Sequence, residues 1–323
     1  MALPLNLWAE QPDFQEELAT LAPESAHSSN QEGTYARLLQ HFQDKISLNS
    51  NLGRKLVSSQ DDKNQPFYRW FRYKEGFSSK LISYLLTEVH SQVGTLLDPF
   101  AGSGAALFSA ASLGWHARGI DVLPVGSHIF AARIAALQVD RQQFTDAVNT
   151  INQVDDFVQY YDPAYSLEHV AISQGAFPQA TENALVGYLA YCQKYITNEY
   201  VRKLALFACF CVLEDISYTR KDEQYLRWDV RSGRSQGKKG KEFRKAKIYT
   251  FTEALREKLA QLVHDLGEGT LFRDEPASMR QYNTPQMTLG SCLEILPTLE
   301  DQSIDVVLTS PPYCNRYDYT RTY

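Results

Sequence analysis

The stretch Asp98-Pro99-Phe100-Ala101-Gly102-Ser103-Gly104 decides the fold class of this 323-residue chain. The apolar run Thr95-Leu96-Leu97 precedes it, and a helical pattern of apolar side chains follows it from Leu107 to Leu113. A second candidate strand then runs from His116 to Asp121. A strand, a glycine turn, a helix and a strand in this order predict the βαβ unit of a doubly wound α/β sheet.

Four parts of the chain differ in composition and are candidate domains. Residues 1–60 are polar and predict a helical or partly mobile lead-in. Residues 61–140 contain the βαβ unit, and residues 286–323 return to α/β character. The intervening residues 141–285 show helical spacing of apolar side chains and no convincing strand, so we expect a large, mainly helical insertion there.

The same periodicities predict elements outside the βαβ unit. Helices are expected over residues 35–48, 80–89, 125–137, 142–161, 181–196, 199–216, 252–266 and 292–299. Extended segments are expected over residues 287–289 and over residues 304–308, the latter as a buried strand. About four strands are expected in all.

The composition excludes several classes of protein. Hydrophobic residues make up 44% of the chain, enough for a substantial core. The longest apolar stretch, residues 204–213, is about half of a membrane span, and the N-terminus lacks the basic flank of a signal peptide. Five cysteines fit neither a disulfide framework nor a zinc site. We therefore expect a cytoplasmic protein that neither enters a membrane nor holds a metal.

A second informative block, Thr309-Ser310-Pro311-Pro312-Tyr313, follows the apolar run of residues 304–308. Together with the glycine block it resembles the catalytic and cofactor motifs of S-adenosylmethionine (SAM)-dependent DNA methyltransferases that modify exocyclic amino groups. The resemblance is specific over residues 67–137 and 286–323. It implies a Rossmann-like class I SAM methyltransferase sheet, double-stranded DNA as the partner, and a role in restriction–modification or phage defence.

The resemblance implies a set of residues around SAM. Asp98 leads the glycine turn and is expected to contact the SAM amine, while Asp121 is expected to accept both ribose hydroxyls. A Cβ atom at Gly102 or Gly104 would collide with the methionine part. Each feature has a structural alternative, a tight turn for the glycines and a helix N-cap for Asp121. The candidate cofactor-binding residues are Phe77, Ser78, Asp98, Pro99, Phe100, Gly102, Gly104 and Asp121.

The resemblance also implies how the second block acts. An exocyclic amine is a poor nucleophile because its lone pair is delocalised into the ring. The Ser310 side chain and the Pro311 carbonyl would accept hydrogen bonds from the amine and draw its nitrogen toward a tetrahedral state. The two prolines would stiffen the loop that holds these acceptors. Tyr313 offers a face on which a flipped base can stack. The candidate catalytic residues are Ser310, Pro311, Pro312 and Tyr313.

Several readings of the substrate remain open. Serine in the first position is the form most often seen in enzymes that resemble cytosine-N4 methyltransferases, so cytosine N4 is ranked ahead of adenine N6. Methylation of RNA or of a protein glutamine is a further alternative, although those families favour Asn at the position of Ser310. An inactive fragment or a DNA- or SAM-binding subunit is the non-enzymatic alternative. Ser291 departs from the family pattern, because an acid that helps to hold the adenine is usual there.

Positive charge is concentrated in the expected insertion. Residues 220–247 hold eleven Lys or Arg against four Asp or Glu, a net of +7, which leaves −13 for the rest of a chain whose total is −6. Tyr and Trp are interleaved with the Arg residues, as suits phosphate contacts and base stacking. The alternative for this expected loop is a solvated charged surface. The candidate DNA-binding residues are Arg227, Trp228, Arg231, Arg234, Lys238 and Lys239.

The end of the chain raises a question of completeness. A complete sheet of this class has further strands after the serine block, and the chain stops ten residues after Tyr313. We therefore expect an incomplete sheet, and either a second polypeptide that carries the remaining strands or a truncated sequence.

Overall fold

The computed structural model describes residues 29–45, 65–71, 73, 78–89, 92–222, 225–234, 242–268 and 283–310. The chain divides into two compact units, Met1–Gly53 and Arg54–Tyr323. The described part of the first unit is the helix α2 (Ser29–Phe42) and the 3-10 helix η1 (Gln43–Lys45). The predicted cofactor, catalytic and DNA-binding residues all belong to the second unit.

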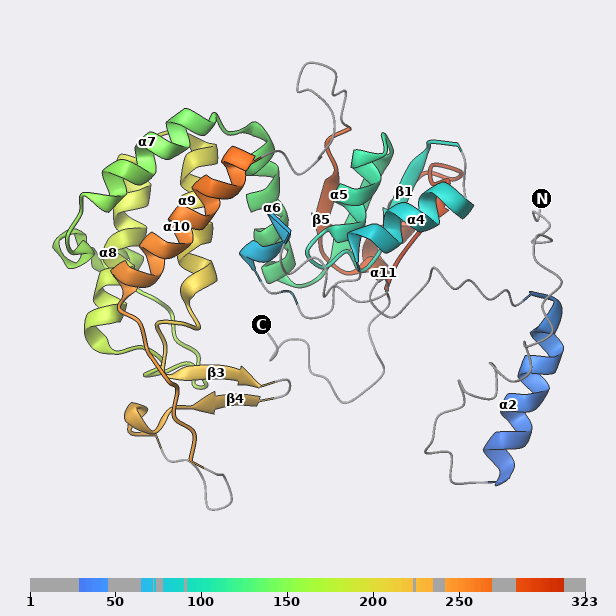
Figure 1. The fold of residues 1–323 in the computed structure, drawn as a ribbon, viewed down its shortest axis with the longest axis horizontal. Helices are drawn as coiled ribbons and strands as arrows, with labels where there is room; N and C mark the ends of the chain where they lie inside the picture. The colour runs from blue at the N-terminus through green and yellow to red at the C-terminus, as the bar shows by residue number, and fades with distance from the viewer. Residues whose placement is uncertain are drawn as a thin grey trace. The chain divides into compact units, whose positions relative to one another are not determined.

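A parallel sheet forms one side of the second unit (Figure 1). Its strands are β1 (Thr95–Asp98), β2 (His116–Asp121), β5 (Gln286–Leu289) and β6 (Val306–Val307). Their order is β5-β2-β1-β6, so the two strands of the predicted βαβ unit lie at the centre. All three pairings are parallel. The predicted α/β fold with about four strands is confirmed.

Helices α4 (Ser79–Val89) and α5 (Ala105–Ser112) cover one face of this sheet. Leu96 of β1, Leu107 and Phe108 are buried between sheet and helices. Gly119 of β2 has a steric reason to be glycine, because a Cβ atom there would lie 2.5 Å from Cδ1 of Leu107. The close approach of α5 to β2 fixes the turn that joins β1 to α5.

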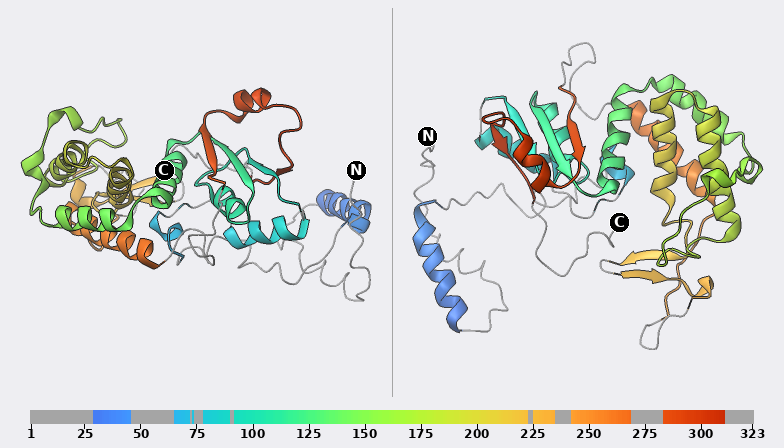
Figure 2. Two further views of the ribbon diagram at one scale, coloured as in Figure 1. Left: turned by 90° about the horizontal axis from the view of Figure 1, so that it is seen from above. Right: turned by 180° about the vertical axis from the view of Figure 1, so that it is seen from behind.

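The other face of the sheet has less cover in the described residues. The short helices α11 (Cys292–Ile295) and η8 (Leu296–Thr298) lie on that side (Figure 2). Leu293 is nevertheless 81% exposed, and Val307 of β6 is 60% exposed. The strand expected over residues 304–308 is therefore present, but it is shorter and less buried than expected: β6 spans Val306–Val307, and only Val306 is partly buried.

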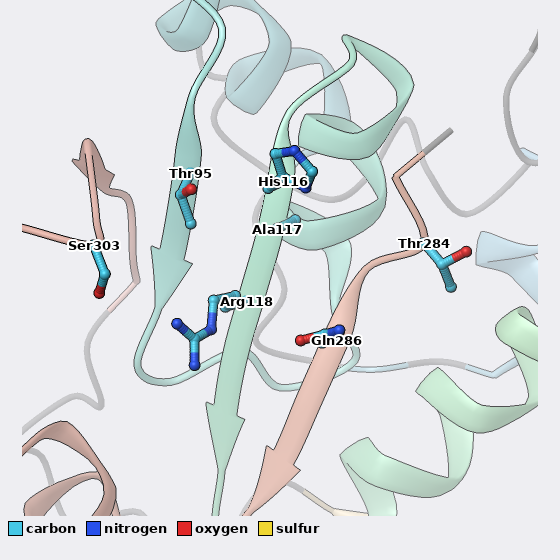
Figure 3. Close-up of a pocket in the computed structure, with 7 residues that line it drawn as sticks. All are labelled: Thr95, His116, Ala117, Arg118, Thr284, Gln286 and Ser303. Carbon is cyan, nitrogen blue, oxygen red and sulfur yellow. The ribbon is translucent and has the colours of Figure 1, made fainter. Parts of the chain in front are cut away.

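A hollow of about 260 Å³ lies among the strands (Figure 3). Arg118 and Gln286 point into it from β2 and β5. Its lining consists of Thr95, His116, Ala117, Arg118, Thr284, Gln286 and Ser303.

Five helices follow β2 and form a second core. They are α6 (Pro124–Gln138), α7 (Arg141–Asn152), α8 (Gln179–Tyr195), α9 (Glu199–Val212) and α10 (Phe251–Glu268). Helix α6 belongs to both cores, because Phe130 packs against Phe108 near the sheet while Ile129 and Ala132 pack among the other helices. The helical insertion thus packs against the sheet region through a shared helix, and the segment 65–71 also contacts both cores. The predicted domain boundaries at residues 60, 140 and 285 stay predictions.

Helix α7 ends earlier than expected. The expected helix over residues 142–161 stops at Asn152, and a separate 3-10 helix, η4 (Phe157–Tyr160), follows. The Asp156 side chain accepts a hydrogen bond from the backbone N–H of Val158 and so begins a new turn. Helix α8 packs directly on the backbone of η4, since a Cβ atom at Gly187 would lie 1.9 Å from the Phe157 carbonyl oxygen. Further 3-10 helices are η3 (Tyr68–Trp70), η5 (Pro163–Tyr165) and η6 (Val230–Ser232).

Part of the expected basic loop is a β-hairpin. Strands β3 (Thr219–Asp222) and β4 (Tyr225–Trp228) pair antiparallel, with Arg220 opposite Arg227. The expectation that the insertion lacks strands is therefore wrong. One face of the ribbon is partly covered, with Thr219 buried, but Thr219 and Lys221 on that face are polar. The sequence of β3 therefore does not show the apolar alternation by which strands are recognised.

A buried acid ties the aromatic segment 65–71 to helix α10. Asp265 accepts hydrogen bonds from Nε1 of Trp70 at 2.8 Å and from Nε of Arg69 at 3.0 Å. Burial alone would raise the pKa of the Asp265 carboxyl, but the hydrogen bonds from Arg69 and Trp70 lower it below its usual range. The segment before the glycine turn is thus held by the helical core. Within the described residues, no helix has the length and apolarity that crossing a membrane requires.

Candidate functional site

The described ends of the cofactor block and the serine block lie at the same edge of the sheet. Asp98 ends β1, Asp121 ends β2, and Thr309 follows β6. The backbone N–H of Leu308 donates to the carbonyl oxygen of Leu97 at 3.0 Å, which places the ends of β1 and β6 side by side. In open α/β sheets, ligands bind outside the carboxyl ends of the strands.

The glycine turn requires glycine for the packing of the protein itself. Gly102 and Gly104 have φ values of +54° and +79°, which favour glycine. A Cβ atom at Gly102 would lie 2.9 Å from Cε1 of Tyr73, and one at Gly104 would lie 2.7 Å from Cδ2 of Phe130. Two aromatic rings therefore restrict these positions, in addition to the predicted collision with SAM. Sequence reasoning did not single out Tyr73 as part of this turn.

Asp121 holds the glycine turn in place. Its Oδ2 accepts a hydrogen bond from the backbone N–H of Gly102 at 2.6 Å, and its Oδ1 accepts one from Leu123 at 2.7 Å. The side chain is buried at the end of β2. Each carboxylate oxygen has a second lone pair, so this arrangement is compatible with the predicted contact to ribose hydroxyls. The structural alternative of an N-cap is not realised, because the N-cap of helix α6 is Leu123 and no side chain caps it.

Asp98 is a buried acid with an elevated pKa. Its Oδ1 accepts hydrogen bonds from the Thr309 hydroxyl at 2.6 Å and from the backbone N–H of Phe100 at 3.1 Å. Burial raises the pKa of Asp98 to about 6, the two hydrogen bonds oppose that rise, and the nearby Asp121 charge adds to it. Among the described residues no cation compensates for the burial. A perturbed acid of this kind is typical of a functional site.

Arg133 supports the glycine turn from helix α6. Its Nη1 donates to the carbonyl oxygen of Ser103 at 2.9 Å, and its guanidinium lies 4.5 Å from the centre of the Tyr68 ring. The side chain is only 2% exposed. Sequence reasoning missed Arg133; a lone charge among the apolar residues of 129–137 was the available signal.

The remaining predicted cofactor residues have varied positions. Ser78 is fully buried, and its Oγ accepts a hydrogen bond from the backbone N–H of Lys80 at the start of α4. Pro99 is buried in the turn, whereas Phe100 is 39% exposed. Phe77 lies outside the described residues. The described part thus gives Ser78 a helix-capping contact and leaves its role toward SAM a prediction.

The serine block is described only in part. Thr309 and Ser310 are half-buried at the end of β6. Pro311, Pro312 and Tyr313 lie outside the described residues, so their roles stay predictions.

Two of the predicted DNA-binding arginines are held by the protein. Arg231 donates from Nε and Nη2 to the two oxygens of Asp229, and this ion pair holds the pKa of the Asp229 carboxyl well below its usual range. Arg234 donates to the carbonyl oxygens of Ala171 and Ile172 and lies 4.2 Å from the Trp228 ring centre. These arginines therefore shape the segment after the hairpin, whatever else they contact.

Of the other predicted DNA-binding residues, Arg227 and Trp228 are described and belong to strand β4. Arg227 is exposed on β4, directly opposite Arg220. Like charges placed opposite each other on a ribbon repel, and a bound polyanion would relieve that repulsion. Lys238 and Lys239 lie outside the described residues. No group of three or more His, Cys, Asp or Glu side chains suited to a metal ion occurs in the described ranges.

Comparison with known proteins identifies relatives. Type II methyltransferase M.AvaI of Nostoc sp. (strain PCC 7120 / SAG 25.82 / UTEX 2576) is 41% identical over 293 residues, which cover 88% of this chain and 58% of that protein. M.AvaI of Anabaena variabilis matches equally. Type II methyltransferase M.BsoBI of Geobacillus stearothermophilus is 36% identical over 282 residues, or 84% of this chain and 54% of that protein. No family model and no solved structure matches.

The chain thus spans somewhat more than half the length of these curated relatives. The two alternatives of a second polypeptide and a truncated sequence both stay predictions. The resemblance to DNA methyltransferases is confirmed, and the chain is a homologue of the type II methyltransferases over most of its own length.

Proposed function

We propose that this chain carries the cofactor-binding and catalytic residues of a site-specific DNA methyltransferase of a restriction–modification system. The reaction is transfer of a methyl group from SAM to the exocyclic amino group of a flipped base, with cytosine N4 ranked ahead of adenine N6. The observation that best supports this function is the hydrogen bond between Asp98 and Thr309. It brings the cofactor motif and the serine block together across 211 residues of sequence.

Three groups of the chain would hold SAM. Asp98 has one oxygen, Oδ2, that receives no hydrogen bond from the described residues, and it is suited to accept one from the SAM amine. Asp121 would accept the ribose hydroxyls with its remaining lone pairs. The turn at Gly102, held by Asp121 and Arg133, would bring backbone close to the methionine part. When bound, SAM supplies an electrophilic methyl group on a sulfonium centre.

Ser310 and Pro311 would prepare the acceptor amine. The Ser310 Oγ and the Pro311 carbonyl oxygen would each accept a hydrogen bond from one N–H of the amine. The nitrogen lone pair is then less delocalised into the ring and can form a bond to the methyl carbon. The carbon–sulfur bond breaks as the carbon–nitrogen bond forms, and the extra amine proton passes to solvent. No covalent bond to the protein is required. Tyr313 would stack on the flipped base and hold its amine toward the serine.

The hairpin and the segment after it are the proposed DNA interface. Arg227 and Trp228 come from β4, and Lys238 and Lys239 follow. Arg231 and Arg234 would act chiefly by shaping this segment, since both donate to protein acceptors. The net charge of +7 over residues 220–247 suits phosphate contacts on an otherwise acidic chain.

Methyl transfer to DNA, RNA and protein acceptors, measured side by side with methyl-labelled SAM, tests this function. We expect incorporation into DNA only, with N4-methylcytosine as the modified nucleoside in mass spectra. Ser310→Ala should lower the transfer rate by about 100-fold, the scale of losing one preorganised contact to the reacting group. Ser112→Ala, an exposed serine at the end of α5, is the matched control. Full activity of Ser310→Ala would remove Ser310 from the mechanism, and labelling of RNA or protein alone would refute DNA as the substrate.

A further inference from the structure

Two hydrogen bonds, one between backbones and one between side chains, connect the ends of strands β1 and β6. The backbone N–H of Leu308 donates to the Leu97 carbonyl oxygen at 3.0 Å, which is the last backbone bond between the two strands. One residue further on, the Thr309 hydroxyl donates to Oδ1 of Asp98 at 2.6 Å. Thr309 is therefore fixed through its side chain where the backbone pairing ends, and Ser310 is the next residue.

The side-chain bond is of a strong kind. Asp98 is 1% exposed, and hydrogen bonds to an ionised group are stronger in such a poorly solvated place. Asp121 at the end of β2 is the ionisable neighbour that acts on Asp98, and its charge disfavours the ionised form. The hydrogen bonds from Thr309 and Phe100 favour that form. Loss of the Thr309 hydroxyl would leave Asp98 with one fewer donor and a higher pKa.

Asp98 also belongs to the glycine turn. The same Oδ1 that accepts from Thr309 accepts from the backbone N–H of Phe100, inside the block 98–104. Oδ2 faces no donor among the described residues and is the oxygen proposed for the SAM amine. One carboxylate thus contacts the catalytic strand end, the cofactor turn and the proposed ligand position.

We propose that Thr309 is a positioning residue, which fixes Ser310 relative to the cofactor through Asp98 and keeps Asp98 ready to accept the SAM amine. The proposal rests on the function proposed above and extends it. Two effects follow from one hydroxyl. Methyl transfer depends on Thr309 because Ser310 is held by it, and SAM affinity depends on Thr309 because Asp98 must be ionised to accept from an ammonium group.

The test compares Thr309→Val with Thr309→Ser in the purified protein. Valine retains the shape of threonine but has no hydroxyl, and serine restores the hydroxyl without the methyl group. The single-turnover rate of methyl transfer is measured at saturating SAM and DNA, and the SAM dissociation constant is measured by calorimetry from pH 5.5 to 8.5. We expect Thr309→Val to transfer at least about 10-fold more slowly, the scale of one hydrogen bond to a charged group.

The pH dependence of SAM binding distinguishes a positioning role of Thr309 from a role in packing alone. In Thr309→Val the pH below which SAM affinity falls should move upward, because Asp98 then protonates at higher pH, and Thr309→Ser should match the wild type in both arms. Wild-type rate together with an unchanged pH dependence in Thr309→Val would overturn the proposal. Should the wild type methylate no DNA even together with a polypeptide that carries the remaining strands, the proposed function fails, while the pH dependence of SAM binding still decides whether Thr309 controls Asp98.

Discussion

Buried carboxylates differ between the helical region and the sheet. In the helical region, Asp265 is paired with Arg69, and Asp229 near the hairpin is paired with Arg231. The pKa values of both acids are lowered. At the sheet edge, burial raises the pKa of Asp98 to about 6, and its described partners are a hydroxyl and a backbone N–H. The comparison indicates that Asp265 and Asp229 stabilise the fold through their ion pairs. The ionised form of Asp98 is instead destabilised by burial, and a cationic ligand group can offset that destabilisation.

The largest expected effect concerns Asp265. Asp265→Ala should lower the free energy of unfolding by roughly 3–5 kcal/mol, because it leaves the Trp70 indole and the Arg69 guanidinium without their buried acceptor. Urea denaturation at pH 7.5 measures the loss. Asp301→Ala, at an exposed turn, is the control and should change stability little. A loss of less than about 1 kcal/mol for Asp265→Ala would show that Asp265 does not stabilise the fold as proposed.

Asp98→Asn should raise the free energy of unfolding at neutral pH, whereas Asp265→Ala lowers it. The folded pKa of about 6 lies above the usual 3.8, so the protonated form favours folding; that contribution is complete below pH 3.8 and is lost as pH rises through 6. The variant lacks this titration, so its stability relative to the wild type should rise by roughly 3 kcal/mol between pH 3.5 and pH 7.5. Its SAM affinity should nevertheless fall about 10- to 100-fold.

Urea denaturation at several pH values and calorimetry with SAM measure the two quantities for Asp98→Asn. A variant that is less stable than the wild type at pH 7.5 would place Asp98 among the structural acids. Unchanged SAM affinity would instead remove Asp98 from the cofactor site.

The smallest expected effect concerns DNA binding by the basic segment. Changing Lys238 and Lys239 together to Ala should lower the slope of log affinity against log salt by about 1.8, at about 0.9 for each phosphate contact. Fluorescence anisotropy with a DNA duplex at several salt concentrations measures the slope. The control pair is Lys194→Ala with Lys203→Ala, whose ammonium groups bind Asp162 and Glu199 within the helical region. Equal changes in both pairs would indicate general attraction by charge instead of a specific interface.

Local sequence determined the βαβ unit. The apolar run before Asp98, the glycine turn and the spacing to Asp121 each act within a few residues, and the structure has β1, α5, β2 and α6 within one to two residues of the expected bounds. The expected helices at α8 and α10 are confirmed for the same reason, since helical periodicity reports burial of one face. The helix expected over residues 292–299 is only partly formed, because α11 ends at Ile295, buries no side chain and is followed by the 3-10 helix η8. The motifs themselves also marked the sheet edge at which Asp98, Asp121 and Thr309 meet.

Tertiary structure decided the features that depend on distant residues. The Thr309 hydroxyl reaches Asp98 only because β6 pairs with β1, and no local pattern encodes that contact. Arg133 contacts Ser103 because α6 packs beside the turn. The hairpin β3–β4 forms without an apolar alternation in the sequence of its strands. Val307 is exposed although it lies in an apolar segment. Periodicity in a sequence reports which side chains are apolar, but packing alone determines what covers them and which polar groups they bring together.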